Sequence, residues 1–175
     1  MKRKPNIIIY VIVAFLIIWP LYQIIGMVRG HSETEDAGKL LYQVSLFQME
    51  LLSSSLHDVD KAKDTNSLNP LRQAVYTASF THEHLVQAYG AKKLRPLEGL
   101  SQLMQYLLRL QIGGQRALKG EEVQTLTESR RLFEEIYDAY GKLMSSGGSM
   151  VSSQNNRLVK ADKEMVELLR KKLLQ

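Results

Sequence analysis

The 175-residue chain has no cysteine, a formal net charge of +5 and 45% hydrophobic residues. The lack of cysteine excludes disulfides, thiolate catalysis and cysteine-ligated zinc. The positive charge is concentrated at the two ends, because 13 Lys or Arg face 15 Asp or Glu between Glu33 and Met144, and this excludes the basic domain-wide surface of a nucleic-acid-binding protein.

Residues 7–28 are apolar except for Gln23 and predict a transmembrane anchor. A stretch of about 22 residues makes about 33 Å of helix, enough to cross the hydrocarbon core of a bilayer. No small-x-small cleavage site follows, since Arg29 lies within the "GMVRG" run. We therefore expect the segment to be retained and not removed as a signal peptide. Gly26 and Gly30 have the spacing of a helix-dimerising pair.

The charges beside this segment indicate its orientation. Lys2, Arg3 and Lys4 precede it, whereas only Arg29 follows closely before a run of acidic residues. The positive-inside rule therefore places residues 1–6 in the cytosol and the rest of the chain outside it. A cleaved signal peptide and the inverted topology are the competing interpretations.

From residue 32 to 145 the apolar residues recur with helical period and no strand pattern appears. We expect four helices here, separated by turns at "DTNSLNP", "YGAKKLRP" and the glycine-rich stretch at 113–120. The positions predicted to face the core are Leu40, Val44, Phe47 and Leu51 in the first helix; Leu71, Val75, Ala78, His82, Leu85 and Tyr89 in the second; Leu97, Leu100, Leu103, Met104, Leu107 and Leu108 in the third; and Leu126, Phe133, Tyr137, Tyr140 and Met144 in the fourth.

The "SSGGS" run predicts a flexible linker at 146–153 before an amphipathic C-terminal helix at 154–175. One face of this helix holds Leu158, Met165, Leu169 and Leu173. The helix either completes the bundle, which its regular ladder of opposite charges favours, or lies on an anionic surface, or docks a partner through those four residues. The predicted fold class is all-α: a single N-terminal transmembrane helix followed by an antiparallel up-down helical bundle of four to five helices.

His82 is the strongest single candidate for a functional residue, because it lies within a row of apolar residues. We expect it to be a hydrogen-bonded core histidine, although a buried imidazole can titrate near neutral pH. His82 and His84 in "THEH" are two residues apart and point to nearly opposite sides of a helix, so they do not form an i,i+4 chelating pair. His57 and Asp60 can share a helix face and are the other candidates. No catalytic motif is present, and we expect no enzymatic activity, no cofactor and no metal.

Four short segments in chain order point to a known family. They are Ser67-Leu68-x-Pro70 with Val75 and Tyr76; Leu94-x-Pro96; Glu122-x-x-Thr125-Leu126-Thr127; and Asn155-Asn156 with Leu158, Asp162 and Glu164. Together with the predicted anchor and helices, they resemble the N-terminal region of YpeB-type spore germination proteins. That family has a short cytosolic start, one anchor and a long helical segment before C-terminal repeat domains, and this chain ends near the point where those repeats begin.

The resemblance implies a membrane-anchored, non-catalytic interaction protein of the bacterial cell envelope. It implies a location in the spore membrane and, as a protein partner, a peptidoglycan (cortex) hydrolase that the chain supports during germination; a homo-oligomer is a further expectation. Two other classes stay open. One is an extracytoplasmic sensor or ligand-binding module that acts through a membrane partner. The other is a metal or acid–base enzyme that uses His57, Asp60 and His82.

Overall fold

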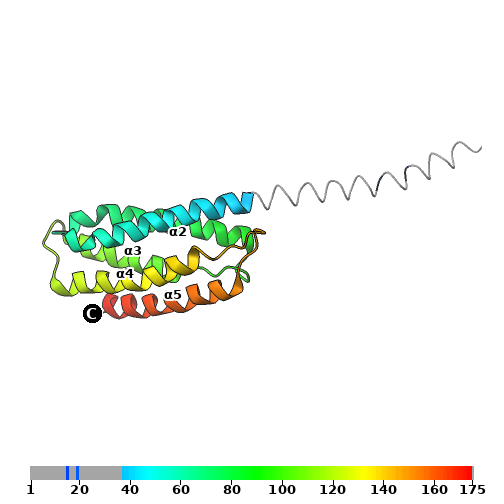
Figure 1. The fold of residues 1–175 in the computed structure, drawn as a ribbon. Helices are drawn as coiled ribbons and strands as arrows, with labels where there is room; N and C mark the ends of the chain where they lie inside the picture. Colours follow the sequence, from blue (N-terminus) through cyan, green and yellow to red (C-terminus); the bar gives the residue numbers. More distant parts are fainter. Residues whose placement is uncertain (1–14, 16–18, 20–36, 175) are drawn as a thin grey trace, which may run out of the picture. The chain divides into compact units, whose positions relative to one another are not determined.

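The computed structural model describes Phe15, Trp19 and residues 37–174 (Figure 1). Apart from Phe15 and Trp19, the predicted anchor at 7–28 lies outside the described residues, as do Gly26 and Gly30. Within the described part of the chain, no helix combines the length and the apolar character needed to cross a bilayer.

The described domain is built from helices. Residues 37–57 are helical and lead into two short 3-10 helices, η1 (Asp58–Lys61) and η2 (Thr65–Leu68). Four long helices follow: α2 (Asn69–Tyr89), α3 (Glu98–Ile112), α4 (Gly120–Tyr140) and α5 (Ser152–Leu173). Residues 37–174 contain two isolated β-bridges but no β-strand. The prediction of an all-α bundle is confirmed.

Local sequence explains where the helices begin and end. The Asp64 side chain accepts a hydrogen bond from the backbone N–H of Ser67 and caps η2. Pro70 lies in the first turn of α2, where its missing N–H is not needed. Gly90 follows α2 with a φ of 84°, a backbone conformation that glycine adopts at little cost.

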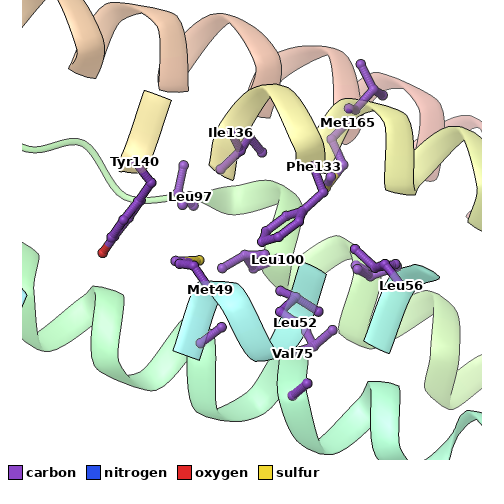
Figure 2. Packing of buried hydrophobic residues seen from close by; sticks show 14 of the residues in the cluster. Met49, Leu52, Leu56, Val75, Leu97, Leu100, Phe133, Ile136, Tyr140 and Met165 are labelled. Atoms are coloured by element: carbon purple, nitrogen blue, oxygen red, sulfur yellow. The ribbon is translucent and has the colours of Figure 1, made fainter. Parts of the chain in front are cut away.

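One core joins all the long helices. The helix at 37–57 lies beside α2, because the Ser45 hydroxyl donates to the Thr81 carbonyl at 3.1 Å. α5 packs along both α4 and α3, and α2 packs against α3. Figure 2 shows Leu52, Val75, Leu100 and Phe133 meeting in this core. α5 therefore completes the bundle.

The first helix packs through a different face from the predicted one. The residues Leu40, Val44, Phe47 and Leu51, called the outer row below, are exposed. The buried residues, called the inner row, are Tyr42, Ser45, Met49, Leu52 and Leu56. The inner row faces the core because its spacing continues to the buried Val59, whereas the outer row ends in Ser54, Ser55 and Asp58. A longer apolar row removes more surface from water.

Residues 146–151 of the predicted linker form an ordered turn between α4 and α5, and Ser152 and Ser153 already belong to α5. The Ser145 N–H donates to the Ser149 carbonyl at 2.9 Å, and the Val151 N–H donates to the Leu143 carbonyl at 2.8 Å. α5 lies in the same compact unit as the other helices, which agrees with the favoured interpretation that the C-terminal helix completes the bundle.

Candidate functional site

His82 is buried and has a hydrogen-bond partner for each ring nitrogen. Its Nε2 lies 2.9 Å from the carbonyl oxygen of Arg95, and its Nδ1 lies 3.1 Å from the Tyr140 hydroxyl. A carbonyl can only accept, so Nε2 donates and a neutral ring accepts from Tyr140 at Nδ1. Burial lowers the pKa of His82 from 6.5 to about 4, against the opposing effect of the Arg95 carbonyl. The expectation of a hydrogen-bonded core histidine agrees with this geometry.

The segment that precedes α3 is held from α5 as well as from His82. The Asn155 side-chain oxygen accepts from the Arg95 N–H at 3.0 Å. The two carboxylate oxygens of Asp162 accept from the N–H groups of Glu98 at 3.0 Å and Gly99 at 2.8 Å. α3 has no side-chain cap of its own, so Asp162 satisfies donors that its first turn leaves free. We call these contacts of His82, Asn155 and Asp162 the loop clamp.

Burial also changes the acidity of Asp162. It raises the pKa of the Asp162 carboxyl from 3.8 to about 6, although the two backbone N–H donors lower it. Gly99 is required beside this carboxyl, because a Cβ at that position would lie 2.7 Å from Asp162 Oδ1 and 3.0 Å from Met165 Sδ. Neither Asp162 nor Gly99 stands out in the sequence as a candidate site residue. The available signal was the seven-residue spacing of Asn155 and Asp162, which puts two polar side chains on the buried face of one helix.

His57 and Asp60 lie on the surface, away from the partners of His82. His57 Nε2 is 3.3 Å from a carboxylate oxygen of Glu134, and Asp60 pairs with Arg130, so both bind side chains of α4. The pKa of Asp60 is lowered, chiefly by its hydrogen bond from Arg130. The structure does not bring His57, Asp60 and His82 into one site. Among the described residues, no three His, Cys, Asp or Glu side chains are grouped to hold a metal ion.

The four residues of α5 proposed to dock a partner belong to the domain core. Leu158, Met165 and Leu169 are buried, and Leu173 is partly buried against the same cluster. Their apolar surface is already covered by the bundle, so in this structure they are not available to a partner. This corrects the docking interpretation.

A polar pocket of about 430 Å³ opens at the end of the bundle where α4 begins and α5 ends. Arg109, Arg116, Lys119, Lys172, Glu121 and Glu122 contribute its charged side chains. Arg116 binds both carboxylate oxygens of Glu122 at 2.6 and 2.8 Å. This pairing is the main reason why the pKa of Glu122 is lowered. Arg109 donates to the last carbonyls of α5, which leaves Lys119 and Lys172 as the cations for a ligand.

The outer row is the apolar surface that the bundle leaves uncovered on its first helix. Leu40, Val44, Phe47 and Leu51 are between 41% and 62% exposed. Their 4-3-4 spacing aligns them along three turns of one helix face, opposite the buried inner row. A helix that is apolar on two opposite faces is ordinarily covered on both.

No protein-family model matches this chain, and no curated protein and no solved structure matches it either.

Proposed function

We propose that this protein is a membrane-anchored, non-catalytic interaction module of the bacterial cell envelope that assembles through its outer row. The observation on which the proposal rests is the line of four exposed apolar side chains opposite the core face of the helix at 37–57. Contiguous apolar surface on a domain with its own complete core marks a protein or membrane contact. The row also begins 12 residues after the end of the predicted anchor at 7–28, close to the membrane surface in sequence.

The buried ionisable groups support a non-catalytic role. His82 uses both ring nitrogens within the bundle, and Asp162 uses both oxygens on the first turn of α3. A general acid or base needs to reach a substrate, whereas these two groups are enclosed and engaged with the chain itself. Their hydrogen bonds hold the segment at 94–99 in place.

The setting of this module follows from the resemblance to YpeB-type proteins. Three of the segments behind that resemblance contribute to the structural contacts described above: Leu94-x-Pro96 lies in the clamped segment, Asn155 and Asp162 clamp it, and Glu122 binds Arg116. The resemblance therefore involves residues that shape this bundle. By the same resemblance, the partner to be supported is a cortex-lytic hydrolase, and the place is the membrane of the developing spore.

A crosslinked capture of the full-length protein tests this proposal. The tagged chain is crosslinked in sporulating and in vegetative cells, solubilised in detergent, and its partners are identified by mass spectrometry. We expect a cell-wall hydrolase to be enriched in the sporulating sample. Enrichment of a sensor kinase or a transporter, equal in both samples, would contradict the germination setting and favour a receptor.

The end pocket favours a second candidate function, a sensor module for a small anion. Within the described part of the chain Lys119 and Lys172 form no salt bridge, although Lys119 lowers the pKa of Glu122 through its charge. A volume of about 430 Å³ is within the range of small-molecule sites. A ligand that binds only the folded state, at 100 times its dissociation constant, stabilises by about 2.7 kcal/mol, or about 5–10 °C in Tm for a chain of this size.

Thermal unfolding of the full-length protein with succinate or inorganic phosphate checks this candidate. The shift is expected to disappear in the variant with Lys119→Ala and Lys172→Ala and to persist in Lys160→Ala, which removes an exposed lysine of α5 outside the pocket. A shift of equal size in all three proteins would indicate a general salt effect and would exclude the pocket.

A further inference from the structure

We propose that the outer row is the seam of a parallel dimer, so that its occupant is the same row of a second copy of this chain. This inference rests on the proposed function, since it names the partner of the surface through which the module assembles. Leu40, Val44, Phe47 and Leu51 are spaced 4-3-4. Apolar residues with this spacing form the a and d positions of a coiled coil, where each side chain packs between side chains of an equivalent helix.

The bundle leaves the row free to make this contact. The inner row of the same helix is fully used, because Met49, Leu52 and Leu56 are 0% exposed in the core. Tyr42 completes that face by donating its hydroxyl to the Tyr140 carbonyl at 2.7 Å. The outer row points the opposite way, so a second copy can approach it without any change in the domain core.

The residues beside the row fit a second copy. The spacing makes Val44 and Leu51 the a positions and Leu40 and Phe47 the d positions. In a parallel coiled coil, the g residue just before an a position of one helix faces the e residue just after the next d position of the partner helix. Gln43 of one copy would then face Gln48 of the other, and Glu50 would face Ser55. No like charges oppose each other across this seam, and a self-complementary surface is what a two-fold symmetric dimer needs.

The predicted anchor would hold the two copies parallel, and it would compensate for the small area that the outer row can bury. Four half-exposed side chains can bury less surface than the roughly 800 Å² that each partner buries in a stable soluble complex. Two copies inserted in one membrane share an orientation and a raised effective concentration. Because residue 28 ends the predicted anchor only 12 positions before Leu40, two anchored chains present their rows side by side and in the same register.

Single cysteines test the pairing directly, because the natural chain has none. Leu40→Cys, Leu51→Cys and the control Val159→Cys are expressed as full-length protein in membranes and treated with a mild oxidant. All three sites are exposed, so folding is retained, and Val159 lies on α5 outside the row. A disulfide needs two Cα atoms within about 7 Å. A parallel seam places each row position against itself, whereas an antiparallel seam centred between Val44 and Phe47 would separate the two copies of residue 40 by about 16 Å.

We expect disulfide-linked dimers at both Leu40→Cys and Leu51→Cys, in several-fold larger yield than at Val159→Cys. Equal dimer yields at the three sites would indicate random collision and would overturn the inference. Adducts of the two row cysteines with other proteins, without self-pairing, would overturn the dimer and leave the proposed function standing. Row cysteines that form no adduct and react with a soluble maleimide as fast as Val159→Cys would overturn both.

Discussion

His82→Ala is expected to lower the free energy of unfolding by about 3–5 kcal/mol. The change removes a fully buried ring and leaves a cavity among the helices. It also removes the hydrogen bonds of His82 to the Tyr140 hydroxyl and the Arg95 carbonyl, and a buried polar group that loses its partner costs about 1–3 kcal/mol. Chemical denaturation of the full-length protein in detergent, followed by circular dichroism, measures the loss.

His84→Ala is the matched control, two residues further along α2. His84 is exposed, with its Nδ1 against the Phe80 carbonyl of its own helix and its ring against the Phe80 ring. Surface substitutions of this kind change stability by about 0.5 kcal/mol or less. Similar losses in the two variants would contradict the structural role assigned to His82. A stable His82→Ala protein that has lost a biological activity would restore the enzyme hypothesis.

The contributions of His82 and Asp162 to the stability of the natural protein are expected to oppose each other between about pH 4 and pH 6. The pKa of His82 is about 4 in the folded protein and 6.5 when unperturbed. As pH falls through this window the unfolded chain binds a proton and the folded chain does not, so stability is lost. The pKa of Asp162 is about 6 in the folded protein and 3.8 when unperturbed, so the folded chain binds the extra proton and stability is gained.

Single substitutions separate the two effects. Asp162→Asn leaves the histidine effect, and the free energy of unfolding should fall by about 3 kcal/mol between pH 7 and pH 4. His82→Gln leaves the carboxyl effect, and the free energy of unfolding should rise by about 2 kcal/mol over the same range. Each pH profile is compared with that of the natural protein, so the exposed acidic groups cancel. Parallel profiles for the three proteins would contradict the assigned pKa values.

The helices were predictable because local signals agree with the tertiary fold. The period of the apolar residues predicts α2, α3 and α4, and Pro70 and Gly90 mark the ends of α2. Arg130 and Glu134 have the i,i+4 spacing of a helix ion pair, yet Arg130 binds Asp60, and Glu134 lies next to His57. Exposed charges on a helix have several partners within reach, and sequence spacing alone does not choose among them.

The helical period of residues 40–51 does not decide between the two rows of the first helix; the continuation of the inner row to Val59 is the sequence signal that favours it. Both rows have helical period, and the outer row is apolar at each of its four positions, whereas the inner row is interrupted by Ser45. The inner row includes Ser45 and Tyr42, whose polar atoms find backbone carbonyls on other helices. Polar residues such as these argue against a buried face in the sequence, because the distant groups to which they hydrogen-bond cannot be identified there. The loop clamp was missed for the same reason: Asp162 binds backbone groups, which no residue type reveals.

The role of the outer row is tested most directly by capture between two differently tagged full-length copies in one membrane, with the natural chain and with Phe47→Asp. Ile112→Asp is the control, because Ile112 is an apolar residue of α3 that is 85% exposed and lies outside the row. We expect the natural chain and Ile112→Asp to capture the second copy, together with any hydrolase bound to the pair, and Phe47→Asp to lose both. Undiminished capture by Phe47→Asp would contradict assembly through the outer row.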